Sequence, residues 1–243
     1  MEGHPSHNQR YITGPLGKQT RPCVIAFDHL SAVPYGRSLL HDISLSIYEG
    51  ETVAVIGPAG AGKSVLLDCI QGVVQPIKGH LQVMGVEVRP MPSTIRRQIG
   101  IMPHHLDHPE MFRVIDLIRR FAGYYSLELS EAQVEEYCHH YGLSPTWFIS
   151  QLTAPQLRVL SLALTLIHDP KLVLLDEPLA GLADADNALI WQYLRRMQSE
   201  GRTLLVTFTP PIAEEQLRGY DLVVMLDKGH IQSQKPRESS SCR

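Results

Sequence analysis

The chain reads TVAVIGPAGAGKS over residues 52–64, and this stretch decides the fold. Thr52–Ile56 is apolar without strict alternation, which is typical of a strand buried on both faces. The following Gly57–Ser64 segment matches the pattern G-x-x-x-x-G-K-[ST], in which glycines let backbone N–H groups turn toward a phosphate. The N-terminus of a following helix adds a partial positive charge and Lys63 adds a full one. The stretch therefore predicts a strand, a phosphate-binding loop (P-loop) and a helix; a glycine-rich turn without a ligand is the alternative.

The P-loop would contact a nucleotide through all of its residues. The expected contacts are Gly57, Pro58, Ala59, Gly60, Ala61, Gly62, Lys63 and Ser64. Ser64 can also place its hydroxyl on Mg²⁺.

A second stretch, KLVLLDEP over residues 171–178, ends an apolar strand in two adjacent carboxylates. Such a pair is costly unless a cation or a water network meets it. In a P-loop protein, Asp176 would hold Mg²⁺ and Glu177 would polarise an attacking water. Alone, the pair also fits an acidic turn after a strand; beside the P-loop it favours a site for Mg-nucleotide hydrolysis.

Composition excludes several other classes. The chain has 243 residues, of which 44% are apolar and 19% charged, with a formal net charge of −3. This describes one large or two small globular domains and gives no broad basic surface for nucleic acid. Its 4 cysteines are far apart, which favours a reducing compartment. No apolar run approaches the roughly 20 residues that cross a bilayer, and the first residues lack a secretory pattern, so we expect a cytoplasmic protein.

Strand and helix patterns around the P-loop predict an α/β fold. Val24–Phe27 and Ile43–Ile47 resemble antiparallel strands, of which the second alternates apolar and polar residues, whereas Val173–Leu175 and Leu204–Val206 resemble the buried strand before the P-loop. Helix-like segments follow the buried strands, at Lys63–Ile70, Pro155–Ile167 and Asn187–Met197. We therefore expect a P-loop NTPase core with a mostly parallel sheet, an antiparallel β subdomain and a helical insertion.

The helical insertion is predicted from Phe112 to Trp147, where the strand-rich texture stops. Ser130–Gln133 has the pattern of a capping box at a helix start, and Gly142 would end that helix. We expect a flexible tail over residues 1–22, a folded domain over 23–232 with its helical subdomain at about 112–160, and a second flexible tail over 233–243.

On these motifs the sequence resembles the nucleotide-binding subunits of ABC transporters, over about residues 24–232. Asp176-Glu177-Pro178 followed by Gly181-Leu182 resembles the Walker B strand and D-loop of that family. IGIMP at 99–103 resembles the run into the Q-loop, and LTAPQLR at 152–158 stands at the LSGGQ signature. The resemblance implies that Tyr35 stacks on adenine, and that Thr153 and Gln156 belong to a helix tip that meets ATP held by an opposite subunit.

The sequence departs from the family pattern at four places. His104 replaces the Q-loop glutamine, Ala154 and Pro155 replace the signature glycines, Ala183 stands at the D-loop aspartate, and Thr209 stands at the switch histidine. Pro155 lacks an N–H, so the helix tip loses one donor, although Thr153 and Gln156 can still form a capping box. Removing one oriented donor from a developing charge typically costs about 3 to 4 kcal/mol of transition-state stabilisation.

His104 lies in the run HHLDH at 104–108, which raises the question of a metal site. Ligands of structural zinc sites usually come from well-spaced positions, so we favour contact with a metal-bound water or a partner. The departures leave Lys63, Ser64, Asp176 and Glu177 intact, and nucleotide binding is expected to survive them. His104 and Thr209 are then candidates to take over, in part, the catalytic roles of the residues that they replace.

The resemblance implies an ATP-binding subunit of an ABC transporter. Two such subunits would bind ATP with Mg²⁺ between them, hydrolyse it, and drive a separate polytopic membrane permease from the cytoplasmic face of the membrane. The four departures suggest an alternative, a hydrolysis-impaired partner in a heterodimer. A further alternative is a non-transport ATPase of the same fold, against which the short insertion and the near-neutral charge argue. No contact with nucleic acid is expected.

Overall fold

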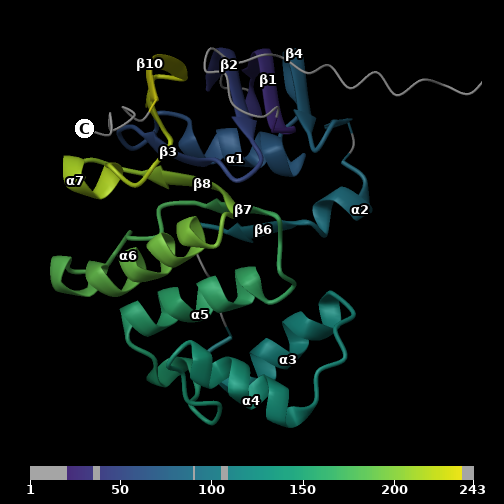
Figure 1. Ribbon diagram of the computed structural model, residues 1–243, viewed down its shortest axis with the longest axis vertical. Coiled ribbons are helices and arrows are strands. Elements are labelled where there is room, and N and C mark those ends of the chain that lie inside the picture. Colours follow the sequence, from purple (N-terminus) through teal and green to yellow (C-terminus); the bar gives the residue numbers. More distant parts are fainter. Residues whose placement is uncertain (1–20, 35–38, 90, 105–108, 237–243) are drawn as a thin grey trace, which may run out of the picture.

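The computed structural model describes residues 21–34, 39–89, 91–104 and 109–236 (Figure 1). Tyr35, His105, Asp107 and His108 lie outside the described residues. Within the described part, the chain folds into two sheets with helices packed between and below them. The sequence therefore predicted the α/β class correctly.

The first sheet is antiparallel and has 4 strands in the order β2-β1-β4-β5. Its strands are β1 (Cys23–Ala32), β2 (Leu40–Tyr48), β4 (Pro76–Val83) and β5 (Val86–Glu87). β2 alternates between buried and more exposed residues as the sequence predicts, and β1 pairs with both β2 and β4. This confirms the antiparallel subdomain.

The second sheet has 6 strands in the order β10-β9-β3-β8-β7-β6. They are β3 (Thr52–Ile56), β6 (Ile99–Met102), β7 (Leu172–Leu175), β8 (Thr203–Phe208), β9 (Leu222–Asp227) and β10 (His230–Pro236). All neighbours are parallel except β9 and β10. β3 lies inside the sheet between β8 and β9, which explains why all of its side chains are buried.

Each face of the parallel sheet has its own hydrophobic core. Val53 and Val55 lie on the face that packs against the antiparallel sheet and α1 (Lys63–Gln71), whereas Ala54 lies on the opposite face. The lower core includes α5 (Ala154–Leu166), α6 (Asp184–Ser199) and the insertion (Figure 1). Because both faces of β3 are covered, its continuous apolar pattern follows directly from its place in the fold.

The helical insertion consists of α3 (Val114–Tyr124) and α4 (Glu131–His140). The Ser130 hydroxyl accepts a hydrogen bond from the Gln133 N–H, and Gln133 Oε1 accepts one from the Ser130 N–H, so the predicted capping box is present. Gly142 follows the helix with a φ of +66°, a value that favours glycine.

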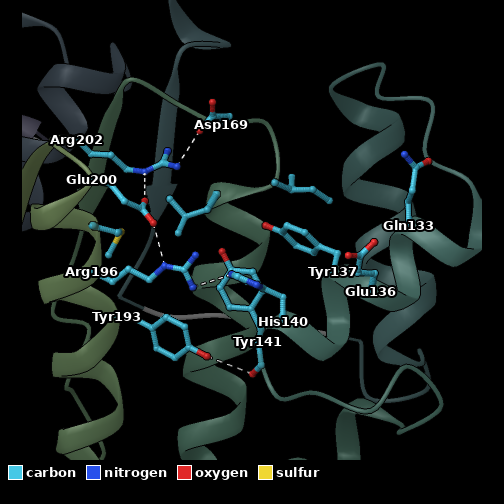
Figure 2. A pocket seen from close by; sticks show the side chains of 13 residues that line it. Gln133, Glu136, Tyr137, His140, Tyr141, Asp169, Tyr193, Arg196, Glu200 and Arg202 are labelled. Atoms are coloured by element: carbon cyan, nitrogen blue, oxygen red, sulfur yellow. Dashed lines mark hydrogen bonds and ion pairs between the residues drawn. The ribbon is translucent and has the colours of Figure 1, made fainter.

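A chain of polar contacts ties α4 to α6 and to the end of α5 (Figure 2). We call it the α4–α6 seam, and its members are His140, Arg196, Glu200, Arg202 and Asp169. Arg196 contacts His140 Nε2 at 2.8 Å and Glu200 at 2.9 Å, and Arg202 contacts Glu200 at 3.0 Å and Asp169 at 2.8 Å. A pocket of about 420 Å³ opens beside these side chains and three tyrosines. The seam fastens the insertion to the core through side chains that satisfy one another.

Two boundaries differ from the sequence expectation. β10 continues to Pro236, past the predicted end of the folded domain at residue 232, because Lys235 and Pro236 pair with β9. α6 begins at Asp184 rather than at Asn187, with acidic residues in its first turn, where the helix dipole favours them. The remaining helices are short, namely α2 (Ser93–Arg96), α7 (Glu214–Leu217) and a 3₁₀ turn at Ile149–Gln151. Among the described residues, no helix has the length and apolar character needed to cross a membrane.

Candidate nucleotide-binding site

The P-loop connects the end of β3 to the start of α1, as the sequence predicts. Gly60 and Gly62 have φ values of +79° and +105°, which L-residues with side chains rarely adopt. A Cβ on Gly57 would lie 2.1 Å from the carbonyl oxygen of Leu226, so the loop passes too close to β9 for any side chain there. These glycines let the backbone curl at the helix N-terminus, the geometry that binds phosphate.

Lys63 is buried beneath the loop, with 4% of its surface exposed. Its Nζ donates to the carbonyl oxygens of Gly57 at 2.8 Å and Pro58 at 3.0 Å. It also lies 3.0 Å from both the Thr209 hydroxyl and Glu177 Oε1. A buried ammonium group is stable here because these four partners are all oxygen atoms. The fold thus brings together residues that follow β3, β7 and β8 and are far apart in the sequence.

The two carboxylates after β7 are each held by a threonine, Asp176 by Thr207 near the end of β8 and Glu177 by Thr209 just beyond it. The Thr207 hydroxyl donates to Asp176 Oδ1 at 2.6 Å and accepts from the Glu177 N–H at 2.9 Å. The Thr209 hydroxyl donates to Glu177 Oε1 at 2.6 Å. Sequence reasoning identified Thr209 but missed Thr207, which lies two positions earlier, within β8.

The surroundings of Glu177 favour the ionised form of its carboxylate. Burial acts to raise its pKa, but the hydrogen bonds from Thr209 and Lys63, the charge of Lys63 and that of His104 together hold its pKa below the usual value for glutamate. Its φ of +49° is unusual for a residue with a side chain. A carboxylate that is ionised and only 20% exposed can accept a proton or orient a water.

Ser64 and Asp176 could hold a magnesium ion. Ser64 is exposed at the start of α1, and Asp176 is 6% exposed at the end of β7. Hydroxyl and carboxylate oxygens are the ligands that Mg²⁺ prefers. Burial, and then the charge of Asp176, raises the pKa of Asp68, one helical turn beyond Ser64. Among the described residues, no group of three or more His, Cys, Asp or Glu side chains is arranged to bind a metal, so Ser64 and Asp176 are proposed as ligands from the motif alone.

The His104 side chain lies close to Glu177, and Arg158 binds the backbone of His104. His104 Nδ1 lies 3.9 Å from Glu177 Oε2. Arg158 on α5 donates to the His104 carbonyl at 3.1 Å and to the Ala180 carbonyl at 2.8 Å. Sequence reasoning did not identify Arg158, because its partners are backbone groups that leave no residue pattern.

The signature segment forms the first turn of α5. The helix begins at Ala154, so Pro155 occupies its second position rather than the first that the sequence suggests. The Thr153 N–H and hydroxyl both donate to Gln156 Oε1, at 2.9 and 3.1 Å. Among the described residues, no hydrogen bond connects Thr153 or Gln156 to the P-loop of the same chain. Ala183, at the D-loop position, is the N-cap of α6 and provides no side-chain cap.

The site combines a buried parallel strand (β3), the P-loop that follows it, and two carboxylates after β7. These features define a P-loop nucleoside triphosphatase. A model of the ABC transporter family matches residues 40–180. The chain belongs to the ABC transporter family, as one of its ATP-binding cassettes.

Curated relatives agree with this assignment. The Nod factor export ATP-binding protein I of Mesorhizobium japonicum is 32% identical over 200 residues, which cover 80% of this chain and 58% of that protein. The phospholipid-transporting ATPase ABCA3 of Homo sapiens is 29% identical over 216 residues, covering 86% of this chain but 12% of that protein. The chain therefore spans little more than half of the first relative and a small part of the second.

Solved structures share the fold. An ATP-binding subunit of an ABC transporter superposes with a TM-score of 0.75 at 22% identity, covering 88% of this chain and 90% of that one. A dimeric ATP-binding cassette in a post-hydrolysis state, bound to ADP and Pi, gives a TM-score of 0.76 at 20% identity, covering 88% and 99%. At these identities the likeness concerns the fold.

Proposed function

We propose that this chain binds and hydrolyses Mg-ATP and thereby drives a separate membrane permease. The observation that carries the proposal is the junction of Lys63, Glu177 and Thr209 at the P-loop, where all contacts are 3.0 Å or shorter. In the proposed cycle two cassettes pair, on the cytoplasmic face of the membrane, with ATP between them. The dimeric form of a structural neighbour supports the pairing, and relatives named for export favour an exporting permease.

The residues divide the chemistry between them. The P-loop N–H groups and Lys63 would bind the β- and γ-phosphates, and Tyr35 the adenine. Ser64 and Asp176 would hold Mg²⁺, which neutralises the developing phosphate charge when bound. Glu177 would accept the proton of a water whose oxygen bonds to the γ-phosphorus. The bond from that phosphorus to the bridging oxygen breaks, which yields ADP and phosphate.

Thr209 and His104 have supporting roles in this scheme. The Thr209 hydroxyl keeps Glu177 Oε1 oriented, and the His104 ring lies near the other carboxylate oxygen. Thr153 and Gln156 would present the tip of α5 to the nucleotide on the partner cassette. Because Pro155 has no N–H to donate, this tip would bind a γ-phosphate more weakly than a glycine-rich one.

Nucleotide titration of the wild type and Lys63→Ala tests the binding step. We expect a fluorescent ATP analogue to bind the wild type in the presence of Mg²⁺ and to lose nearly all affinity for the variant, since the variant lacks the buried ammonium. Equal binding by both proteins would refute the assignment of the site. Arg196→Met, in the α4–α6 seam, is the matched control, because it also removes one positive charge but should bind as the wild type does.

The second candidate function is a cassette that binds ATP and hydrolyses it slowly within a heterodimer. The residues at the four departures favour it, in particular Thr209, which cannot carry the positive charge of a histidine. Steady-state phosphate release decides between the two. Turnover at ordinary transporter rates that disappears in Glu177→Gln supports the first function, and binding without turnover supports the second.

A further inference from the structure

Arg158 connects three parts of the site that are far apart in the sequence. It is the last residue of the LTAPQLR stretch and lies just after the first turn of α5. One guanidinium nitrogen donates to the His104 carbonyl and the other to the Ala180 carbonyl, at 3.1 and 2.8 Å. Two fixed donors of one planar group thus bind two separate loops, which a flexible ammonium could not do with the same geometry.

The Ala180 contact acts on Glu177 through a tight turn. The Ala180 N–H donates to the Glu177 carbonyl at 3.0 Å, and Arg158 holds the opposite face of the same residue. Glu177 itself has a φ of +49°, a conformation that costs energy and persists only where its surroundings enforce it. The Thr207 hydroxyl holds the Glu177 N–H from one side. Arg158 holds the turn from the other.

The contact with His104 also acts near Glu177. Arg158 binds the backbone of His104, whose ring lies 3.9 Å from Glu177 Oε2. On α5, the Leu157 N–H donates to the Thr153 carbonyl at 2.9 Å, so the helix tip and Arg158 are one rigid turn apart. Any displacement of the tip therefore moves the guanidinium relative to both carbonyls.

We propose that Arg158 is a positioning residue, which couples the seating of the α5 tip to the placement of Glu177 and His104. The proposal rests on the proposed ATPase function for its kinetic consequence. When α5 is seated, the guanidinium holds the Glu177–Ala180 turn and the backbone of His104 in the arrangement seen here. When α5 is displaced, the turn relaxes and Glu177 loses its orientation toward the attacking water.

Hydrogen exchange of the full-length chain tests the placement without any need for turnover. In Arg158→Met, we expect the Ala180 amide to exchange at least about 10-fold faster than in the wild type, since the turn is held from one side only. Amides of β3 and α6 should be unchanged. Arg158→Gln keeps a donor for one carbonyl and should give a smaller increase. Arg196→Met is the matched control and should leave the Ala180 amide as it is.

Steady-state kinetics test the consequence. We expect Arg158→Met to lower kcat by about 10- to 100-fold with KM for ATP within about threefold of the wild type, because the residue places Glu177 and does not touch the nucleotide. Unchanged exchange at Ala180, or unchanged kcat in an active enzyme, would overturn the proposal. A wild type without ATP turnover would instead contradict the hydrolysis function, and the exchange result would still decide the role of Arg158. Should Arg158→Met fail to fold, Arg158→Gln provides both measurements.

Discussion

Replacing Thr209 by valine removes one hydroxyl and keeps the shape of the side chain. That hydroxyl donates to Glu177 Oε1 at 2.6 Å and accepts from Lys63 Nζ at 3.0 Å. Lys63 retains both P-loop carbonyls and Glu177 in the variant, so its ammonium remains satisfied. Glu177 loses its shortest hydrogen bond. We therefore expect hydrolysis to suffer far more than ATP binding.

The size of the effect follows from the kind of bond. A hydrogen bond to a charged group contributes about 1.5 to 3 kcal/mol, and Thr209 is partly exposed, which favours the lower half of that range. At about 1.4 kcal/mol for each factor of ten, Thr209→Val should lower kcat by about 10- to 40-fold. The dissociation constant for Mg-ATP should change by less than about threefold, because the phosphate-binding N–H groups and Lys63 are unchanged.

The assay is phosphate release under saturating ATP, with binding measured separately by a fluorescent nucleotide. Thr203→Val is the matched control, because Thr203 is the first residue of β8, at the end away from the P-loop, and its hydroxyl accepts from the Gly50 N–H at 2.9 Å. It should lose about 1 kcal/mol of stability and keep its kcat. If Thr209→Val hydrolysed ATP at the wild-type rate, the junction would have no part in catalysis and our reading of it would be wrong.

Three further outcomes concern stability. Gly57→Ala should cost about 3 kcal/mol or more in urea unfolding, since its Cβ would lie 2.1 Å from the Leu226 oxygen, whereas Gly85→Ala, with nothing within 4 Å of its Cβ and a φ of +76°, should cost about 1 kcal/mol. The pKa of Glu177 is lowered in the folded state, so its ionisation stabilises the fold above the pKa of an unfolded glutamate, and this contribution is lost as the pH falls through the folded value. Urea unfolding between about pH 5 and 3 should therefore show a smaller loss of stability in Glu177→Gln than in the wild type, and equal losses would contradict the pKa shift. Arg196→Met should destabilise by less than about 1 kcal/mol in thermal unfolding, because the Arg196 side chain is 51% exposed; a larger loss would mean that the α4–α6 seam is energetically stronger than its exposure suggests.

Sequence alone could predict those parts of the molecule that short-range patterns determine. The buried strand Thr52–Ile56, the P-loop after it and the helix from Lys63 follow from apolar runs and glycine spacing, and they occur where expected. The capping box at Ser130 is equally local. The functional importance of Asp176 and Glu177 could also be predicted, because burying two carboxylates after an apolar strand is costly unless a cation is present.

Contacts between distant segments could not be predicted in this way. β10 was missed because most of its residues are exposed and its position depends on pairing with β9. Thr207 looks like one more residue of a buried strand until β7 and β8 are placed in register, which brings it to Asp176. Arg158 acts on backbone carbonyls, and any residue type at 104 or 180 would supply the same acceptor. Tyr35 lies outside the described residues, so its stacking on adenine stays a prediction.

The strand order has a consequence for how the protein is made. β3 carries the P-loop near the start of the chain, but its partners in the sheet, β8 and β9, come near the end, with Thr52 paired to Leu204 and Val53 to Leu222. A ribosome synthesises the chain from the N-terminus, so the P-loop strand emerges long before either neighbour exists. ATP therefore cannot stabilise the nascent chain until β8 and β9 have been made. Until then, the exposed apolar edge of β3 is the segment that a chaperone would have to protect.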